Sequence, residues 1–537
     1  MFLLLLLLAA AATALRVPGS PFPPPLDGLN ASRSLLVAFT DGLSPSDLLT
    51  LQLLQGVLNK RRPTLARAPR GGDAELWLNA TRDVWGVALN YSLATLPALV
   101  AAFAPQLRGF ALCALSDNSS NTAAAVAAAV DVLVVTPQNQ ALAAAAGLPL
   151  LYDLRGKGTA WALDTFNGTS GFAFSPTVTS LQRPSAGQAC MADYAVASGA
   201  LQWWDDDVAG ALAARVWGSL APPFAVLGWG PDELGTVTAA SRRGGGVVAS
   251  DWATNLDVLS AFDVPALAQR VPPPPPPPPP PAPSPAQHTV CFLMSDGDNV
   301  QFLLNGFATD ARWYGSPARG AVPLGWTLSA ATADLAPAVP QRLYAAATPR
   351  DVFVAGVSGA GYFYPDEVLA GAGGAAALRA LAGLSEALMG KAGLRIANVL
   401  ARADGAPPAG AVEALLSRPG IEALLWYPFS DYSGLRGAIS WSSGGKPVIG
   451  GRMNLWGDGA NPSGPTFFNV TGLARALLAQ ARDPASAAGY SLVPVHAWSH
   501  TVADVAEVMR LVEAGGGGVE AVTPDAFVAR IQGSVKH

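Results

Sequence analysis

Charged residues are scarce in this chain of 537 residues. Asp, Glu, Lys and Arg together make up 13% of it, against roughly 25% in an average soluble protein. The 33 basic and 38 acidic residues leave a formal net charge of −5, and the basic residues do not gather into a patch or stripe. A nucleic-acid-binding surface requires such a patch, so we expect no nucleic-acid partner.

Cysteine is also nearly absent. The chain has three, Cys113, Cys190 and Cys291, and their spacing resembles no zinc site. One disulfide at most can form, and Cys113–Cys190 is the pair we expect, because Cys291 lies in an apolar stretch where a thiol serves as a small core residue. Burial of apolar side chains must therefore hold the fold together.

Long apolar runs are missing after the first residues, since no later run of about 18 uncharged apolar residues predicts a membrane helix. The run from Phe2 to Ala14 is uninterrupted and ends in small residues, which is typical of a signal peptide and too short for a membrane span. We predict a signal peptide over 1–15, with an uncleaved anchor as the alternative. The protein is then expected in the secretory pathway, as a secreted, cell-wall or vacuolar protein with no membrane span after cleavage.

Asn-X-Ser/Thr sequons support this route, because an exported chain is glycosylated at such sites on exposed loops. Five sequons precede the proline run described below, and one follows it. The predicted glycosylation sites are Asn30, Asn79, Asn90, Asn118, Asn167 and Asn469.

The mature chain is long enough for three domains of ordinary size. Alternating helical and strand-like patterns predict an N-terminal α/β domain over 30–157 and a second α/β domain over 158–271. Pro272 to Pro281 is an unbroken proline run, which cannot enter a sheet. We interpret 272–287 as a Pro-rich linker or, preferably, an inserted surface loop.

From 288 to 534 the alternation becomes regular and predicts a (β/α) barrel-like domain, a TIM-barrel-like fold of about seven or eight strands. An open doubly wound sheet is the alternative, because periodicity does not separate the two. The predicted strands are 289–294, 324–329, 352–357, 395–401, 423–427, 447–450, 492–497 and 519–522.

In a barrel of parallel strands, catalytic groups lie at the carboxyl ends of the strands. The first predicted strand ends in Asp296, Gly297 and Asp298. Two acids that flank a glycine at a strand exit are typical of site carboxylates or cation ligands, with solvated turn residues as the alternative. Four more acids follow other strands and complete the candidate catalytic set: Asp366, Glu367, Asp404 and Asp431.

Aromatic and polar residues also gather after the predicted strands. Aromatic rings can stack on the apolar faces of pyranose rings, and Asn side chains can bind hydroxyl groups; packing of loops is the alternative role. Tyr362 and Tyr364 alternate on an extended segment, so both can point to one side. The candidate substrate-binding residues are Asn299, Gly359, Gly361, Tyr362, Tyr364, Arg452, Trp456, His496 and Trp498.

The segment from Gly359 to Pro365 reads Gly-Ala-Gly-Tyr-Phe-Tyr-Pro. It resembles, letter for letter, the signature of the GxGYxYP putative glycoside hydrolase family. The strand running into Asp296 and Asp298 resembles the C-terminal domain of that family, and the segments 54–59 and 249–256 resemble its N-terminal part. This resemblance covers about 30 to 530 and implies a sugar-processing role. The proline run departs from the family pattern, which favours an insertion.

Three functions stay open, each with a carbohydrate partner. The first is a glycoside hydrolase that needs no cofactor, in which one carboxyl acts as acid and a second as base or nucleophile. The second is a metal-dependent carbohydrate esterase or deacetylase, in which Asp296, Asp298, His496 and His500 hold a divalent cation such as zinc. Against it, Thr501 to Asp504 resembles a helix capping box beside His500. The third is a non-catalytic glycan-binding protein.

Overall fold

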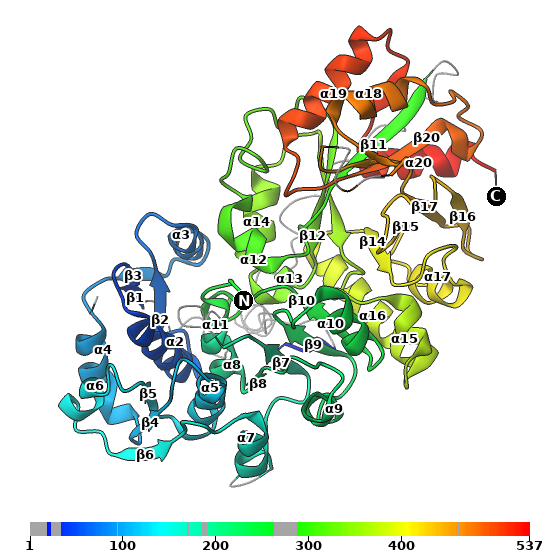
Figure 1. Ribbon diagram of the computed structural model, residues 1–537. Coiled ribbons are helices and arrows are strands. Elements are labelled where there is room, and N and C mark those ends of the chain that lie inside the picture. The colour runs from blue at the N-terminus through cyan, green and yellow to red at the C-terminus, as the bar shows by residue number, and fades with distance from the viewer. Residues whose placement is uncertain are drawn as a thin grey trace, which may run out of the picture.

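The computed structural model describes residues 19–22, 34–93, 95–168, 171–184, 191–262, 287–458, 462 and 464–536. The predicted signal peptide, Asn30, Cys190 and all but the last residue of the segment 272–287 lie outside the described residues. The described chain forms four sheets with mostly parallel strands and helices between them, which is a mixed α/β fold (Figure 1).

The range predicted as one N-terminal domain contains two three-stranded parallel sheets. The first unit has the order β2-β1-β3, formed by β1 (Ser34–Phe39), β2 (Leu65–Ala68) and β3 (Ala88–Asn90). The second unit has the order β5-β4-β6, formed by β4 (Phe110–Leu112), β5 (Leu133–Val135) and β6 (Leu150–Asp153). The helices of these two units are α2 (Pro45–Asn59), α3 (Asp73–Trp85), α4 (Leu96–Phe103), α5 (Ser119–Val130) and α6 (Ala141–Ala145).

Helix α2 begins as its sequence predicts. Ser44 is the N-cap, its hydroxyl accepts a hydrogen bond from the backbone N–H of Asp47, and Pro45 occupies the first helical position. The helix is then buried from Leu49 to Asn59 and contacts the third unit, because Gly56 leaves room for the backbone of Asp193.

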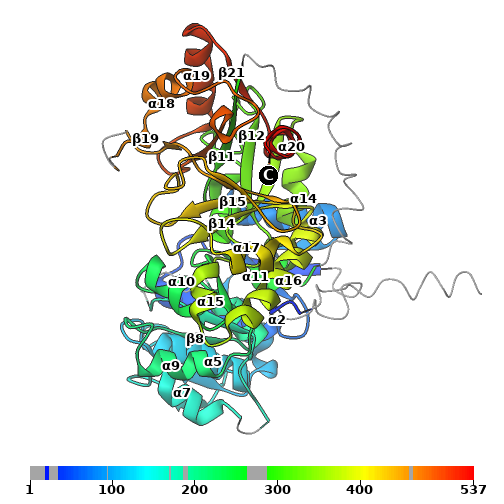
Figure 2. The same cartoon turned by 90° about the vertical axis from the view of Figure 1, so that its right-hand side faces the viewer.

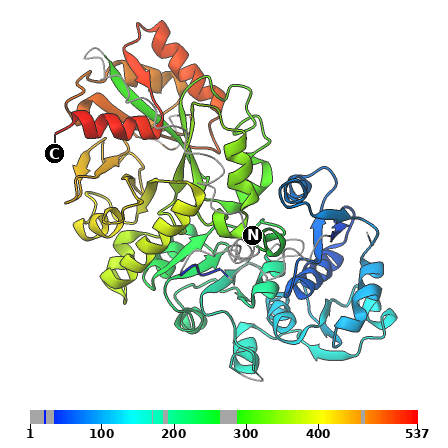
Figure 3. The ribbon, with the colours of Figure 1, turned by 180° about the vertical axis from the view of Figure 1, so that it is seen from behind.

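The third unit, residues 171–262, is a parallel sheet with the order β10-β9-β7-β8. Its strands are β7 (Val178–Leu181), β8 (Leu201–Trp203), β9 (Phe224–Leu227) and β10 (Gly245–Val248), and its helices include α8 (Ala192–Ser198), α9 (Ala211–Gly218), α10 (Glu233–Ser241) and α11 (Leu256–Leu259). Gly244 takes a φ of +78° after α10, and Gly245 and Gly246 then begin β10. The unit lies between the N-terminal sheets and the C-terminal sheet in both the front and back views (Figures 1 and 3).

The C-terminal unit, residues 287–536, is built on a curled parallel sheet with the order β17-β15-β14-β13-β12-β11-β20. These strands are β11 (His288–Met294), β12 (Leu324–Ser329), β13 (Asp351–Gly356), β14 (Ile396–Ala401), β15 (Ala423–Pro428), β17 (Pro447–Gly450) and β20 (Tyr490–Val495). Every strand predicted for this region is present, with each end displaced by two residues at most.

The two ends of this sheet approach each other. Gly451, directly after β17, forms a parallel bridge with Leu492 of β20, and β18 (Asn454–Leu455) pairs with β20 as well. β21 (Val519–Ala521) pairs with the first residues of β11, whereas β12 pairs only with its last two. The sheet therefore curls strongly and exposes neither face of β11, whose residues are all buried.

Helices cover the outside of the curled sheet, including α16 (Gly374–Ala392), α18 (Val470–Leu478), α19 (Val502–Ala514) and α20 (Pro524–Ser534) (Figure 2). Within the described ranges, no helix is long and apolar enough to span a bilayer. Of the sequons in those ranges, Asn118, Asn167 and Asn469 are exposed, and Asn79 and Asn90 are half-buried.

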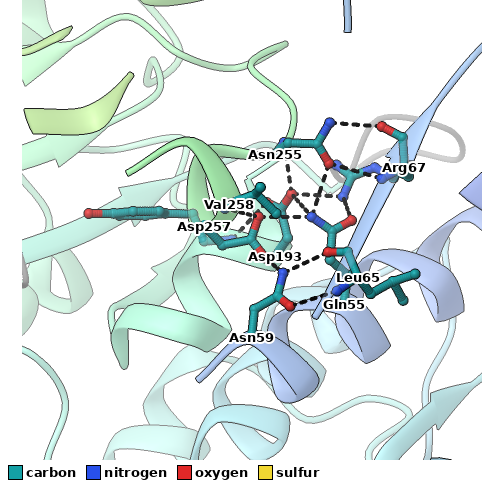
Figure 4. Close-up of polar contacts among 9 residues, drawn as sticks. Gln55, Asn59, Leu65, Arg67, Asp193, Asn255, Asp257 and Val258 are labelled. Carbon is teal, nitrogen blue, oxygen red and sulfur yellow. Dashed lines mark hydrogen bonds and ion pairs between the residues drawn. The ribbon is translucent and has the colours of Figure 1, made fainter. Parts of the chain in front are cut away.

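A buried polar network joins the first unit to the third (Figure 4). The Nη1 atom of Arg67 donates to Asp193 at 2.7 Å and to the Oε1 atom of Gln55 at 2.9 Å. The Nε2 atom of Gln55 donates to Asp257 at 2.8 Å, and Asn59 donates to the second oxygen of Asp257 at 2.6 Å. Burial raises the pKa of both carboxyl groups, and the Arg67 charge opposes this effect.

The network completes a contact between segments far apart in the sequence. Asn255, with a φ of +61°, donates to the carbonyl of Arg67 at 2.8 Å and accepts from the backbone N–H of Arg67 at 3.0 Å. The six side chains of this polar network are each 4% exposed or less: Gln55, Asn59, Arg67, Asp193, Asn255 and Asp257. Because the segments 54–59 and 249–256 both contribute to it, their role is to join two units.

Candidate functional site

The chain turns sharply where β11 ends, and two carboxyl groups follow that turn. Asp296 has a φ of +68°, an uncommon conformation for a residue other than glycine. Gly297 passes so close to β12 that a Cβ atom would lie 1.6 Å from the carbonyl oxygen of Thr327. The N–H of Gly297 also donates to Oγ1 of Thr327 at 2.8 Å. The glycine is therefore required by contact, and it fixes the placement of Asp296 and Asp298.

Asp298 is a half-buried residue directly after this turn. Burial, followed by the negative charges of Asp296 and Glu233, raises the pKa of Asp298 to about 8. No other residue in the described chain donates a hydrogen bond to its carboxyl group. A pKa in this range favours the protonated form of this half-buried acid at neutral pH.

Asp296 is surrounded by hydrogen-bond donors. Nε1 of Trp498 donates to its Oδ1 atom at 2.8 Å, and the hydroxyl of Ser295 donates to Oδ2. Asn299 contributes a longer contact of 3.5 Å. These donors hold the carboxylate toward the ends of β11 and β20, where Trp498 lies.

A third carboxyl group comes from another unit. Glu233 is the first residue of α10, and the hydroxyl of Tyr362 donates to its Oε1 atom at 2.7 Å. Burial raises the pKa of Glu233, the hydrogen bond from Tyr362 lowers it, and the charge of Asp296 raises it further. The charges of Glu233, Asp296 and Asp298 therefore act on one another, and we refer to these three carboxyl groups together as the carboxylate hollow.

Sequence reasoning missed Glu233. The segment Gly230 to Glu233 predicted only the start of a helix, which is what Asp232 does as N-cap by accepting from the N–H of Gly235. Acidic residues are common in the first helical turn because of the helix dipole. Nothing in that local pattern distinguishes Glu233 from an ordinary first-turn acid; only its partner Tyr362, more than a hundred residues later, does so.

The loop after β13 attaches the third unit to the C-terminal unit. Tyr362 and Val247 of β10 exchange two backbone hydrogen bonds, at 2.7 and 2.9 Å. A Cβ atom on Gly361 would lie 3.2 Å from the carbonyl oxygen of Val247, and one on Gly359, with a φ of +96°, would lie 2.6 Å from Ser385. The two glycines thus allow the loop to lie against its neighbours.

Both tyrosines of this loop are buried. Their hydroxyl groups lie 3.4 Å apart, with Tyr362 directed at Glu233, and the N–H of Tyr364 donates to Ser241 at 3.0 Å. The hydroxyl of Tyr362 therefore contacts Glu233 of the carboxylate hollow, and the hydroxyl of Tyr364 contacts that of Tyr362.

Aromatic residues from the ends of β15, β18 and β20 border the carboxylate hollow. Trp456 stacks on His496 with ring centroids 4.0 Å apart, and Tyr432 meets Trp456 edge to face at 5.1 Å. Burial raises the pKa of Tyr432, and the charges of Asp296, Glu233 and Asp298 raise it further. Burial lowers the pKa of His496, which keeps its ring neutral at pH 7.

The other predicted acids are engaged in local contacts. Asp366 accepts from the backbone N–H groups of Arg402 and Ala403, at 3.1 and 2.7 Å. Glu367 forms an ion pair with Arg242 at 2.6 Å. These two acids lie in the first turn of α15 (Pro365–Ala370) and connect that helix to the segment after β14 and to Arg242.

The acids after β14 and β15 are held in the same way. Asp404 is exposed and accepts from the hydroxyl of Ser430. Although burial acts in the opposite direction, hydrogen bonds from Ser433, Asn454 and Thr466 lower the pKa of Asp431. Of the six acids predicted as catalytic, the structure brings Asp296 and Asp298 into the hollow, and the remaining four support loops.

Arg452 lies with its guanidinium on backbone carbonyls, those of Tyr490 at 2.8 Å and Ala487 at 2.7 Å. Arg452 is therefore held by backbone carbonyls beside β20. The other polar and aromatic candidates lie at the border of the carboxylate hollow: Asn299, Trp456, His496 and Trp498.

The histidines do not converge with the acids as metal ligands. Nε2 of His500 contacts the carbonyl of Gly457 at 2.7 Å, and its Nδ1 lies 3.5 Å from Asp504. Thr501 and Asp504 form the predicted capping box. In the described part of the chain, no three His, Cys, Asp or Glu side chains form a group able to hold a metal ion.

A separate cavity of about 630 Å³ lies between the first and second units. Its two carboxylates are held by donors, Asp41 by the backbone N–H of Arg70 at 3.0 Å and Asp47 by Asn139 at 3.1 Å. Both of these carboxylates accept hydrogen bonds from neighbouring residues, whereas Asp298 accepts none from another residue of the described chain, so we assign the candidate site to the carboxylate hollow.

Comparison with known proteins places the same residues in a family. Residues 286–532 match the model described as "GxGYxYP putative glycoside hydrolase C-terminal domain". Residues 176–261 match the "GxGYxYP third domain", and residues 107–169 match the "GxGYxYP_N second domain". No curated protein matches the chain.

The fold has a counterpart among solved structures. A crystal structure described as a putative hydrolase from Bacteroides thetaiotaomicron superposes with a TM-score of 0.82 at 24% sequence identity. The match covers 93% of this chain and 95% of the other, so the two share the arrangement of all their units.

Proposed function

The chain belongs to the GxGYxYP putative glycoside hydrolase family, and from that premise we propose that it hydrolyses glycosidic bonds of an oligo- or polysaccharide in the carboxylate hollow. One observation supports this proposal above the others. Asp298 is an accessible acid with a pKa raised to about 8, and two further carboxyl groups, Asp296 and Glu233, are close enough to contribute to that shift.

Glycoside hydrolysis requires such a combination. The leaving oxygen must receive a proton while positive charge develops on the sugar ring, and carboxyl groups on two sides of the bond provide both effects. We assign proton donation to Asp298, because it is protonated at neutral pH and no other residue of the described chain engages its carboxyl group. Asp296 and Glu233 provide the negative charge that stabilises the developing cation.

The remaining residues hold these groups in place. Trp498 and Ser295 orient Asp296, and Tyr362 orients Glu233. Because Glu233 comes from the third unit, the site is complete only when that unit and the C-terminal unit are joined. The GxGYxYP loop joins them through the backbone contact between Tyr362 and Val247.

The proposal predicts a pH dependence with a definite sign. Asp298 must carry its proton to act as an acid, so the rate is lost as the pH rises through about 8. On the acidic side of the pH–rate profile, the rate is lost when Glu233 becomes protonated. This limb lies above the ordinary pKa of a glutamate, because burial raises the pKa of Glu233.

The decisive experiment compares two leaving groups. Initial rates are measured on aryl glycosides of several common sugars, with a dinitrophenyl group, which leaves without a proton, and with a phenyl group, which requires one. Asp298→Asn is expected to lose activity on phenyl glycosides and to retain much of it on dinitrophenyl glycosides. Equal losses on both, or no hydrolysis of any glycoside by the unaltered protein, would overturn the assignment.

A further inference from the structure

Two tryptophan side chains lie exposed beside the carboxylate hollow. Trp252 is 53% exposed and Trp498 is 51% exposed, although the large aromatic side chains of this chain are generally buried. Exposed indole rings leave apolar surface in contact with water. Several such rings close to a candidate site indicate a ligand-binding surface.

The two tryptophans come from different units, and both contact the same short element. The backbone N–H of Trp252, in the third unit, donates to the side chain of Gln301 at 3.1 Å. The ring of Trp498, after β20, packs against Phe302 with centroids 4.7 Å apart. Gln301 and Phe302 are consecutive residues of α12 (Val300–Phe302), whose Cα atoms are about 3.8 Å apart. Both tryptophans therefore contact α12, Trp252 through its backbone and Trp498 through its ring.

Trp498 is held with one part of its ring free. Its Nε1 atom donates to Asp296 at 2.8 Å, and its ring contacts Phe302 and Trp313, the latter edge to face at 5.6 Å. A ring fixed on one side by aromatic contacts and by a catalytic carboxylate offers its exposed side to a ligand that lies next to Asp296.

Trp252 is anchored through its backbone. Its carbonyl accepts from Asn305 at 3.2 Å, and the preceding Asp251 accepts from the N–H of Trp229 at 2.7 Å. Trp229 in turn packs edge to face on Tyr362 at 5.9 Å. The loop that carries Trp252 is thus tied to the same tyrosine that orients Glu233.

We infer that Trp252 and Trp498 form two stacking subsites, one from each unit, that bind successive pyranose rings of an extended oligosaccharide entering the carboxylate hollow. This inference rests on the proposed function for the class of ligand. Stacking suits sugars because pyranose rings present C–H groups on their faces, and rigid aromatic rings bind them with little loss of conformational freedom. Two platforms on either side of α12 select a chain of several units over a single sugar.

The experiment measures binding, so that it does not depend on turnover. Cello-, xylo-, manno-, malto- and galacto-oligosaccharides of about one to six units are titrated into the Asp298→Asn protein, with calorimetry and tryptophan fluorescence as readouts. We expect affinity to rise with chain length for at least one series. Trp252→Ala and Trp498→Ala should each lower the affinity for the longest probe about tenfold and lower the affinity for shorter probes by less.

Conservative variants separate stacking from other effects. Trp252→Phe and Trp498→Phe keep an aromatic ring and should retain most of the affinity, although Trp498→Phe loses the N–H that reaches Asp296. Leu150→Ala removes a side chain that is 52% exposed in the second unit and serves as the matched control.

The outcomes distinguish this inference from the proposed function. If a series binds through the tryptophans but the unaltered protein hydrolyses none of its members, the stacking subsites stand and hydrolysis fails. If hydrolysis is found but the alanine variants bind long probes as well as the unaltered protein, the stacking inference is overturned. Absence of binding to every series also overturns it.

Discussion

The third unit contributes to two groups of buried carboxyl groups that differ in how they are enclosed. In the polar network, Asp193 and Asp257 lie against Arg67, Gln55 and Asn59, and all are almost completely buried. In the carboxylate hollow, Asp298 keeps an accessible surface and no partner in the described chain. Burial raises carboxyl pKa values in both places.

The comparison shows that a raised pKa alone does not identify a catalytic acid. Asp193 and Asp257 accept hydrogen bonds from buried neighbours and are themselves almost completely buried, so a ligand cannot reach their oxygens. Asp298 is half-buried, and no other residue of the described chain donates to its carboxyl group. Accessibility together with a missing partner separates a site from a structural network.

The largest effect is expected from Asp298→Asn. The amide cannot give up a proton, so hydrolysis of a substrate with a poor leaving group should fall by about 10²–10⁴-fold. Stability should change little, because no other residue of the described chain donates to this carboxyl group. Initial rates and chemical denaturation measure the two effects; a destabilised variant would place Asp298 with the polar network instead.

Asp193→Asn should lower the stability of the protein and leave the rate of hydrolysis unchanged. It removes the carboxylate that pairs with the buried Arg67 guanidinium at 2.7 Å, and breaking such a pair costs roughly 3–5 kcal/mol of the free energy of unfolding. Urea denaturation measures this loss, and the rate per folded molecule should remain. Asp164→Asn is the matched control, because it breaks an exposed pair with Arg215 at 2.7 Å and should cost about 1 kcal/mol or less. Equal effects of the two variants would refute the structural role of Asp193.

Asp257→Asn tests the network at a position without a direct ion pair. Both oxygens of Asp257 accept hydrogen bonds, from Gln55 and from Asn59. An amide places an N–H₂ group against one of these donors and leaves it unsatisfied, which costs about 1–3 kcal/mol. Urea denaturation checks this value, and a stability equal to that of the unaltered protein would show that Asp257 is not held as described.

Tyr362→Phe is expected to have the smallest effect. It removes the hydroxyl that donates to Glu233 and keeps the ring. Because that hydrogen bond lowers the pKa of Glu233, its loss raises the pKa further and shifts the acidic limb of the pH–rate profile to higher pH. The rate should fall about tenfold. An unchanged acidic limb would separate Glu233 from the reaction.

Much of the C-terminal sheet could be predicted because its strands are short, apolar runs separated by helical patterns. Buried parallel strands have this pattern regardless of their partners. Asp296 and Asp298 were found by the same logic, since they stand where a buried strand ends. The curling of the sheet, with Gly451 pairing to Leu492, depends on contacts between distant segments, and no local pattern encodes it.

The contribution of the third unit to the site could not be predicted for a related reason. Glu233 has the sequence context of an ordinary first-turn acid, and Tyr362 has that of a strand-end aromatic. Their meeting requires the docking of two units through Val247, a contact between backbone atoms. Side-chain patterns carry no record of such a contact, except for the small residues that permit it, Gly246 and Gly361.

The backbone bridge between Val247 and Tyr362 has a consequence for how the signature evolves. Gly361 lies against the main chain of Val247 and Gly359 lies against Ser385, so both glycines are required by packing within the protein. The tryptophans and loops around the site can therefore change, and substrate specificity with them, while the seven residues of the signature are retained. Two proteins that share the motif therefore share this contact between two units, and their substrates can differ.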